Sequence, residues 1–465
     1  MDRKNDAVEK VDRALLKKYD RPGPRYTSYP TVPEWSSDFG PDDYRQVLAA
    51  ASKTDSGLSL YFHLPFCRAS CLYCGCTTVV TSNSGRVDEY LSRLETEMNL
   101  VTQVLGRHKR VIQLHWGGGT PTHLSADQIR RLYGSIAGHF SIVPEAEIAI
   151  EVDPRVTTDE QLQLLRELGF NRISLGVQDL TPQVQAAIGR NQTAEQTIAL
   201  FKRCREVGFS GINIDLIYGL PYQTVDNFAS TIDEVIALGA DRVAVYSFAY
   251  LPEIRPHQKR ILPEWLPSAD AKYELFSTAV ERFLGAGYVQ IGMDHFARPQ
   301  DEMAQALAKG QLHRNFMGYT VRPASESIGF GMSAISEFPG AFAQNLSTLE
   351  TYAKAIDAGQ PATFRGWRLS DDDRIRQRAI LSLMCNFILE FAALDRAFKI
   401  DSKTYFALEL AALKPFIADG LVAVTDADVT VLPRGKVFVR NVAMIFDAYL
   451  RAQGEERQRI FSRTI

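Results

Sequence analysis

Short apolar runs alternate with longer amphipathic stretches between about residues 58 and 250. The amphipathic stretches carry apolar residues at the helical period, and several begin at a capping residue, namely Ser125, Thr158, Thr193 and Thr224. The apolar runs have the length of buried strands, and they span 59–66, 111–117, 147–153, 172–179, 211–220 and 242–250. Strands that alternate with helices predict an α/β fold in which a parallel sheet with right-handed crossovers curls into a partial (β/α)6 barrel.

Chemically informative residues come at the ends of these predicted strands. Cysteines follow the first strand, a glycine run follows the second, and acidic residues end the third. Ligands of such folds bind at the carboxyl ends of the strands, so we expect one site at one end of the sheet. The later strands contribute Gln178, Asp215, Ala249 and Tyr250.

The remaining sequence divides into parts with different patterns. Residues 1–57 are irregular and rich in Pro, Arg and Tyr, and we expect an arm that lies over the active site. Residues 58–365 would form the main domain. Residues 366–465 would form a small, mostly helical domain, in which LVAVTDADVTVLPRGKVFV resembles the paired strands of a winged helix.

The overall composition is that of an ordinary globular protein, with 45% hydrophobic and 23% charged residues. A formal net charge of −3 gives no sign of a nucleic-acid or anionic-membrane partner. The first residues, MDRKNDAVEK, lack the apolar core of a signal peptide, and no apolar run is long enough to span a bilayer. We therefore expect a cytoplasmic protein without membrane insertion.

Four of the six cysteines lie in the run HLPFCRASCLYCGCTT, with the spacing C-x3-C-x2-C-x-C. Clustering of this kind in a long chain favours a metal site over disulfides, whereas Cys204 and Cys385 fit a buried core. Three thiolates from this run can hold a [4Fe–4S] cluster and leave one iron open for a ligand. A structural zinc site is the alternative, although it usually takes two separated ligand pairs. His63 is a further possible ligand or a neighbour of the metal.

A second motif, HWGGGTPT, spans residues 115–122. Three glycines after a strand let a backbone come close to a ligand, with amides available to bind it. A tight strand-to-helix turn is the alternative. A phosphate loop is also conceivable, but the Lys-Ser/Thr that completes one is absent. The motif better suits a carboxylate or an amino-acid group.

The three-cysteine run followed by GGTP resembles the radical S-adenosylmethionine (SAM) superfamily. The resemblance narrows to the oxygen-independent coproporphyrinogen III oxidases and extends over essentially the whole chain. It is carried by PGPRYTSYPT, YFHLPFCRASCLYCGC, LHWGGGTPT, EVDPR, FNRISLGVQD, NIDLIYGLP, GMDHFARP, LHRNFMGYT and FSRTI. It implies an oxidoreductase of haem synthesis that converts the ring A and ring B propionates of coproporphyrinogen III to vinyl groups, giving protoporphyrinogen IX.

The resemblance also implies the cofactors and their ligands. Cys67, Cys71 and Cys74 would hold one [4Fe–4S] cluster, whose open iron takes the amino and carboxylate groups of SAM. Two SAM molecules are implied. The cluster-bound SAM would be contacted by Tyr61, Gly118, Glu151 and Ile335. The second SAM would be contacted by Tyr73, Gly119, Thr120, Gln178, Arg190, Asp215 and Ala249.

In the implied reaction, an electron from the cluster cleaves SAM, and a 5′-deoxyadenosyl radical takes a hydrogen from the propionate carbon next to the pyrrole ring. The resemblance places Cys76 and Tyr61 at the catalytic centre, with Cys76 assisting catalysis or cluster assembly. It further implies an electron donor of the flavodoxin or ferredoxin type and a monomeric enzyme.

A substrate with four carboxylates needs cations, for which the arm and the polar segments offer Arg21, Arg25, Arg298 and Arg314. The sequence departs from the family pattern in two places. Arg322 and Glu326 stand in a stretch where the family has polar residues of the type TQGD. Ile388 stands where an arginine is expected.

Three other functions compete with this interpretation. A haem chaperone of the same superfamily usually carries Phe at the position of Cys76 and lacks the N-terminal arm. A radical SAM methyltransferase acting on haem would differ in the mass of its product. A nucleic-acid-binding protein that uses the winged-helix-like region is disfavoured by the neutral charge and the absence of a basic stretch.

Overall fold

The computed structural model describes residues 13–452, 461 and 463–464. The chain forms two compact units, each built from more than one segment. We call Trp35–Ser268 with Arg322–Arg368 the sheet unit, and the described parts of Met1–Glu34, Ala269–Val321 and Leu369–Ile465 the C-terminal unit. The predicted domain boundaries after residues 57 and 365 stay predictions. Residues 1–12 of the predicted arm, and Ser462 and Ile465 of the FSRTI motif, lie outside the described residues.

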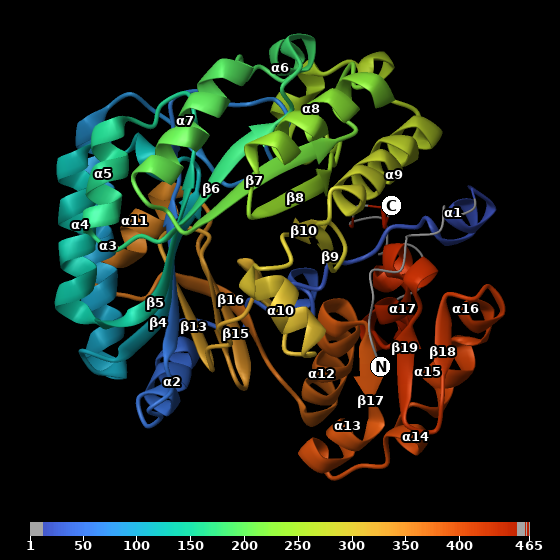
Figure 1. Cartoon of the computed structure of the whole chain (residues 1–465). Helices are drawn as coiled ribbons and strands as arrows, with labels where there is room; N and C mark the ends of the chain where they lie inside the picture. The colour runs from blue at the N-terminus through green and yellow to red at the C-terminus, as the bar shows by residue number, and fades with distance from the viewer. Residues whose placement is uncertain (1–12, 453–460, 462, 465) are drawn as a thin grey trace. The chain divides into compact units, whose positions relative to one another are not determined.

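Parallel strands form the centre of the sheet unit, in the order β1-β4-β5-β6-β7-β8 (Figure 1). These are β1 (Leu58–Leu64), β4 (Arg110–Gly118), β5 (Ser141–Val152), β6 (Arg172–Gln178), β7 (Gly211–Tyr218) and β8 (Arg242–Ser247). Each corresponds to one predicted strand. Their apolar residues are buried, as the run of Leu60, Phe62 and Leu64 in β1 illustrates. The predicted α/β fold with a partial parallel barrel is therefore confirmed.

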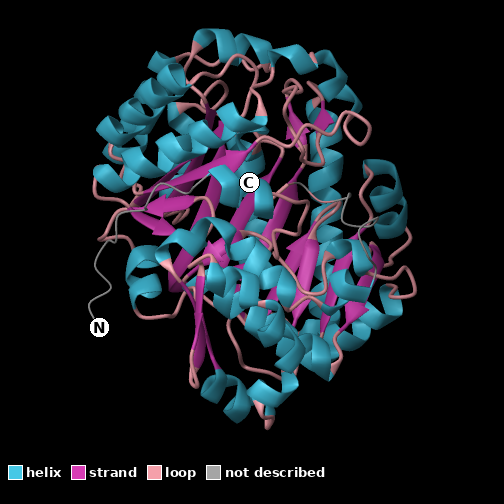
Figure 2. Ribbon diagram, turned by 90° about the vertical axis from the view of Figure 1, so that its right-hand side faces the viewer, coloured by secondary structure: helices cyan, strands magenta, loops and turns pink. Residues whose placement is uncertain are grey.

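Helices connect the parallel strands and lie along the outside of the sheet (Figures 1 and 2). They are α3 (Ser84–Leu105), α4 (Ala126–His139), α5 (Asp159–Glu167), α6 (Pro182–Ala187), α7 (Ala194–Glu206) and α8 (Val225–Leu238). Capping boxes start four of them at the predicted residues, Ser125, Thr158, Thr193 and Thr224. In each box the hydroxyl accepts from a backbone amide one turn later, which satisfies a donor that the helix itself leaves unpaired.

The sheet continues beyond β1 with strands that the sequence pattern did not predict. β13 (Glu326–Phe330) runs parallel to β1, and the following β14 (Ile335–Phe338), β15 (Ala341–Asn345) and β16 (Thr363–Arg368) are antiparallel. The buried carboxylate of Glu97 on α3 accepts hydrogen bonds from Gly331, Asn345 and Tyr352, and so fastens this extension to the helical layer. The remaining elements of the unit are α2 (Pro41–Ala51), α11 (Leu349–Asp357), β2 (Phe66–Cys67) and β3 (Val79–Val80).

The C-terminal unit is mostly helical. Its helices are α1 (Arg13–Tyr19), α9 (Ala269–Gly285), α10 (Glu302–Ala308), α12 (Asp371–Asn386), α13 (Phe391–Phe398), α14 (Ser402–Tyr405), α15 (Ala407–Ala412), α16 (Lys414–Ala418) and α17 (Val439–Ile445). Three antiparallel strands, β17 (Ile388–Glu390), β19 (Asp428–Val431) and β18 (Val422–Val424), form one small sheet. Two hairpins, β9 (Val289–Ile291) with β10 (His295–Ala297) and β11 (His313–Asn315) with β12 (Gly318–Thr320), complete the strands. Within the described residues, no helix is long and apolar enough to cross a membrane.

Candidate active site at the carboxyl ends of the parallel strands

The loop that carries the four clustered cysteines follows β1 and is held by backbone hydrogen bonds on both sides. The amide of Val79 donates to the Pro65 carbonyl at 2.8 Å, and the amide of Thr81 donates to the Cys67 carbonyl at 3.1 Å. The His257 ring contacts the Cys74 carbonyl at 2.8 Å through Nε2. These hydrogen bonds tie both ends of the loop and the backbone at Cys74 to the rest of the sheet unit.

The thiols of the loop meet different partners. Cys67 Sγ lies 3.6 Å from the Thr120 hydroxyl, and Cys71 Sγ lies 3.6 Å from a guanidinium nitrogen of Arg155 and of Arg190. A hydrogen bond with Cys76 lowers the pKa of Cys74 to about 6, so this thiol readily gives the thiolate that binds metal. Burial raises the pKa of Cys67 to about 11.

Among the described residues, no three His, Cys, Asp or Glu side chains converge on a point where they would hold a single metal ion. A [4Fe–4S] cluster makes a different demand, because each thiolate binds a different iron atom and the sulfurs stand apart around the cluster. Cys67, Cys71 and Cys74 lie on one short loop and influence one another electrostatically. Their placement and chemistry fit a three-thiolate cluster better than a tetrahedral zinc site.

The glycine motif packs against the cysteine loop so closely that side chains are excluded. A Cβ atom on Gly119 would lie 2.4 Å from the Pro65 carbonyl oxygen, and one on Gly118 would lie 2.7 Å from the His63 ring. The Gly119 amide donates to the Leu64 carbonyl at 2.9 Å, and the Thr120 amide donates to the Phe66 carbonyl at 2.9 Å. These amides are therefore engaged within the protein, and the expectation that they would bind a ligand is wrong. An ammonium group, which only donates, would need carbonyl oxygens of this segment instead.

One group of polar side chains surrounds Glu151 at the end of β5. The half-buried carboxylate accepts from the Gly118 amide at 3.1 Å and contacts His115 Nε2 at 3.3 Å. Desolvation favours the neutral acid, but these two contacts outweigh it and hold the pKa of Glu151 below its ordinary value. The Tyr61 ring stacks on the His115 ring with centroids 5.9 Å apart. Tyr61, Gly118 and Glu151 thus lie together, as sequence reasoning grouped them.

His63 connects this group to the cysteine loop. Its Nε2 lies 2.9 Å from the Thr77 carbonyl oxygen, and its Nδ1 lies 3.1 Å from the Tyr61 hydroxyl. Burial lowers the pKa of His63, so the ring is neutral. A carbonyl only accepts, hence Nε2 carries the proton and Nδ1 accepts from Tyr61. Ile335 belongs to the same neighbourhood, because Gly329, the strand partner of Tyr61, packs against the Ile335 carbonyl.

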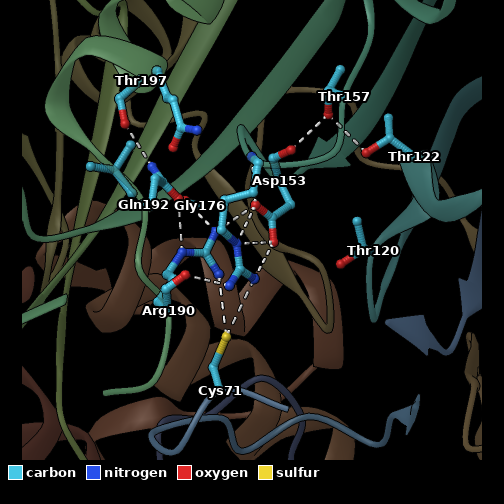
Figure 3. A network of polar contacts seen from close by, with 12 residues as sticks. Cys71, Thr120, Thr122, Asp153, Thr157, Gly176, Arg190, Gln192 and Thr197 are labelled. Carbon is cyan, nitrogen blue, oxygen red and sulfur yellow. Dashed lines mark hydrogen bonds and ion pairs between the residues drawn. The ribbon is translucent and has the colours of Figure 1, made fainter. Parts of the chain in front are cut away.

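A second group surrounds Arg190, which is 6% exposed (Figure 3). Its Nη1 donates to Cys71 Sγ at 3.6 Å and to the Tyr73 hydroxyl at 3.1 Å, and its Nη2 donates to the Gly176 carbonyl at 2.6 Å. Nε donates to Gln192 at 2.9 Å, and the Asp153 carboxylate lies 3.4 Å from Nη2. Four donor hydrogens of the guanidinium thus make hydrogen bonds, and the Asp153 carboxylate balances its charge. A ligand carboxylate at Arg190 would have to compete with Asp153 or displace one of these hydrogen bonds.

The other residues predicted for the second SAM adjoin this group. Asp215 is the strand partner of Gly176, and it accepts from Ser174 at 3.0 Å and from Asn213 at 2.8 Å. Gln178 lies beside Gly176 at the end of β6 with a φ of 71°, a left-handed conformation that is uncommon for a residue with a side chain. The Ala249 carbonyl accepts from Gln258 at 3.2 Å.

Sequence reasoning did not single out Arg155, which the structure places at the centre of the second group. Its guanidinium binds Asp153 through Nη2 at 2.6 Å, donates to the Arg190 carbonyl through Nη1 at 2.6 Å, and reaches Cys71. His115 and His257 were missed as well. EVDPR and HWGGG were recognised as motifs, but nothing in the sequence alone distinguishes which of their polar residues face the loop.

The arginines expected to bind substrate all belong to the C-terminal unit. Arg25 forms an ion pair with Asp294, Arg314 is buried, and Arg298 is exposed. Arg21 binds Thr464 through its backbone. Of the residues that depart from the family pattern, Glu326 accepts from Thr54 and Ser56 at the amino end of β1, away from the cysteines.

Comparison with known proteins agrees with this geometry. Residues 61–235 match the radical SAM superfamily, and residues 369–438 match the HemN C-terminal domain. The oxygen-independent coproporphyrinogen III oxidase of Pseudomonas aeruginosa is 43% identical over 456 residues, 98% of each chain. That of Escherichia coli K12 is 44% identical over 455 residues, again 98% of each chain.

A solved structure of the coproporphyrinogen III oxidase of Escherichia coli, a radical SAM enzyme, superposes with a TM-score of 0.91 at 42% identity. The alignment covers 96% of this chain and 100% of that one. The similarity therefore spans both units and every motif of the cysteine loop, the glycine run and the strand ends. The chain belongs to the oxygen-independent coproporphyrinogen III oxidases of the radical SAM superfamily.

Proposed function

We propose that this protein carries out the oxygen-independent oxidative decarboxylation of coproporphyrinogen III to protoporphyrinogen IX. The observation that carries the proposal is the meeting of a three-cysteine loop with two polar groups, one around Glu151 and one around Arg190, at the carboxyl ends of the parallel strands. Relatives of the same length, similar over 98% of the chain, have the same activity in their names.

Cys67, Cys71 and Cys74 would hold the [4Fe–4S] cluster, and the fit of their loop supports this assignment. When bound, the cluster and SAM together supply one electron and a radical able to remove a hydrogen atom from an unactivated carbon. The protein's own residues hold the loop through contacts of His63 and His257 with its carbonyl groups. Two guanidinium groups donate hydrogen bonds to Cys71, and the close packing of the glycine run leaves no room for side chains there.

Two SAM molecules would bind at this site, each contacted by one of the two residue sets. Tyr61, Gly118, Glu151 and Ile335 would contact the cluster-bound molecule. Glu151 is ionised in the folded protein and suits an ammonium group or ribose hydroxyls. The second molecule would be contacted by Tyr73, Gly119, Thr120, Gln178, Arg190, Asp215 and Ala249. Arg190 would there serve first to position Tyr73 and Cys71, since its Nη1 donors are already engaged by them.

Each decarboxylation removes a hydrogen from the propionate carbon next to the pyrrole ring, releases CO2 and passes one further electron onward, which leaves a vinyl group. These reaction steps need no acid–base pair in the protein. They need a site that keeps water and oxygen away from the radical. Cys76 and Tyr61 are proposed as residues that assist at the reacting centre. A flavodoxin- or ferredoxin-type donor, a monomeric state and a cytoplasmic location complete the proposal.

Anaerobic incubation with SAM, a reductant and coproporphyrinogen III tests the proposal. The expected product has lost one CO2 and two hydrogens for each vinyl group formed. Stable haem binding with no vinyl product would favour a haem chaperone, and a product heavier by methyl groups would favour a methyltransferase. Cleavage of SAM without a vinyl product would contradict the oxidase function.

A further inference from the structure

A cavity of about 730 Å³ lies within the C-terminal unit, between the loop at residues 308–314, helix α12, strand β17 and helix α13. This volume falls in the range of roughly 300–1,000 Å³ that is usual for small-molecule sites. None of the cysteine, glycine or strand-end residues of the candidate active site lines it. The cavity is therefore separate from the candidate active site, and no step of the proposed reaction involves its residues.

Arg314 lines this cavity and is 7% exposed. Its Nε and Nη1 atoms are buried and have no hydrogen-bond partner in the described part of the chain. Arginine is seldom buried without a partner, because the charged group loses its hydration and gains nothing in return. Buried polar atoms left in this way usually meet an ordered water or a ligand.

The neighbours of Arg314 hold it in place without satisfying these donors. Its guanidinium lies over the Tyr319 ring at 4.5 Å, and the Tyr319 hydroxyl is itself fixed by the Met384 carbonyl at 3.2 Å and the Met293 amide at 3.3 Å. A stacked guanidinium of this kind has its plane set before any ligand arrives, so little conformational freedom remains to be lost on binding.

The carboxylate of Asp294, on which the charge of Arg314 acts, is engaged by other residues. Asp294 accepts from Arg25 through Oδ2 and contacts His295 through Oδ1 at 2.7 Å. Burial alone would raise the pKa of Asp294, but the charge of Arg25, the His295 hydrogen bond and the charge of Arg314 hold it well below its usual range. Asp294 thus offsets part of the Arg314 charge, while Nε and Nη1 of Arg314 still meet no acceptor among the described residues.

The other charged groups that line the cavity make it positive. Lys309 and Arg378 are exposed at its edge, and Glu390 is the acidic residue among those that line it. Arg314 and Arg378 line the same cavity, together with the buried Cys385. Two arginines and a lysine around a cavity favour an oxyanion, and a guanidinium fork matches a carboxylate in particular.

We propose that this cavity is a binding site for a carboxylate-bearing anion, with Arg314 as its buried donor and Arg378 and Lys309 at its entrance. The anion has two possible sources. One is a propionate of coproporphyrinogen III, and this alternative rests on the proposed function. The other is a small free oxyanion, which would bind whether or not the protein acts on porphyrinogens.

Binding to the full chain without SAM or reductant tests the proposal separately from turnover. Coproporphyrin III, a stable oxidised relative of the substrate, is titrated by tryptophan fluorescence. Succinate and inorganic phosphate are titrated by thermal shift at constant ionic strength. Arg314→Met, which keeps the length of the side chain but removes the donors, is expected to weaken binding of the anion about tenfold or more. Arg378→Met is expected to weaken it less, and the exposed Arg130→Met on α4 serves as the control.

The binding results distinguish the two possible sources of the anion. Loss of coproporphyrin affinity alone identifies a propionate site, and loss of succinate or phosphate affinity alone identifies a site for small oxyanions. Equal affinities in wild type and both variants would overturn the proposal and leave an ordered water as the partner of Arg314. If Arg314→Met does not fold, as circular dichroism would reveal, Arg314→Lys and the exposed Arg378→Met carry the test, and unchanged binding in both would again overturn it.

Discussion

The guanidinium of Arg155 lies 3.6 Å from the sulfur of Cys71, measured from Nη2 to Sγ. The same guanidinium donates hydrogen bonds to the Asp153 carboxylate through Nε and Nη2. Asp153 directly follows β5, so the end of this strand fixes the position of the guanidinium. Among the three proposed cluster ligands, Cys71 thus accepts from two guanidinium groups, those of Arg155 and Arg190. Hydrogen bonds to cluster sulfurs are one of the means by which a protein sets the reduction potential of an iron–sulfur cluster.

Replacing Arg155 by glutamine should lower the reduction potential of the reconstituted cluster. Reduction adds a negative charge, which the guanidinium stabilises. A difference of about 1.4 kcal/mol corresponds to about 59 mV for one electron, and we expect a fall of that order. Redox titration followed by electron paramagnetic resonance measures it. Arg130→Gln, at an exposed residue of α4, should leave the potential unchanged. An unaltered potential in Arg155→Gln with full iron content would show that this contact is structural only.

Gly119→Ala should destabilise the protein and impair cluster loading. The new methyl group would lie 2.4 Å from the Pro65 carbonyl, and backbone atoms cannot move aside as a flexible side chain does. Overpacking of this kind costs about 1–3 kcal/mol. Gly134→Ala is the matched control, since a Cβ there meets nothing within 4 Å on α4 and should stabilise the helix by up to about 1 kcal/mol. Urea unfolding of both variants checks the prediction, and equal effects would refute it.

Single Ser substitutions at Cys67, Cys71 and Cys74 should each abolish the [4Fe–4S] signal after anaerobic reconstitution, because a hydroxyl is a poor ligand for this cluster. Cys76→Ser should retain the iron, since Cys76 is an exposed member of the same loop and is not among the proposed ligands. Iron and sulfide analysis with electron paramagnetic resonance distinguishes these outcomes. Loss of iron in Cys76→Ser alone would mean that the ligand set is assigned wrongly.

The stability of the protein should depend on pH through His63. Burial lowers its pKa in the folded state, whereas the unfolded side chain titrates near 6.5. As the pH falls through about 6.5, the unfolded chain takes up a proton that the folded chain does not, so the free energy of unfolding decreases. His63→Gln removes this contribution, and its free energy of unfolding should vary less between about pH 6.5 and pH 5. Urea unfolding at several pH values measures this dependence, and an equal change in the free energy of unfolding for the wild type and His63→Gln would contradict the prediction.

Much of the sheet unit could be predicted from the sequence, for physical reasons that are local. The capping residues Ser125, Thr158, Thr193 and Thr224 form the hydrogen bonds that start their helices, and the apolar runs are buried strands. The strands β14, β15 and β16 pair with near neighbours in the sequence and were nonetheless missed. The strand β13 was missed because it pairs with β1, more than 250 positions earlier, as Leu58 with Glu326 shows. No local pattern reports such a pairing.

The candidate site shows the same limit. The resemblance to the family was enough to group Tyr61 with Glu151, and Tyr73 with Arg190. The amides of the glycine run, however, bond to Leu64 and Phe66, which the motif alone does not reveal. The role of Arg155 also depends on contacts with Cys71 and Arg190, which are distant in the sequence, and so it appears only when the chain is folded.

Isotope transfer from the substrate tests the central claim most directly. Coproporphyrinogen III with deuterium on the propionate carbons next to the pyrrole rings is incubated anaerobically with the reconstituted protein, SAM and a reductant. The account predicts a divinyl product together with 5′-deoxyadenosine that carries the deuterium. Unlabelled 5′-deoxyadenosine and unchanged porphyrinogen, under conditions in which SAM is cleaved, would contradict it.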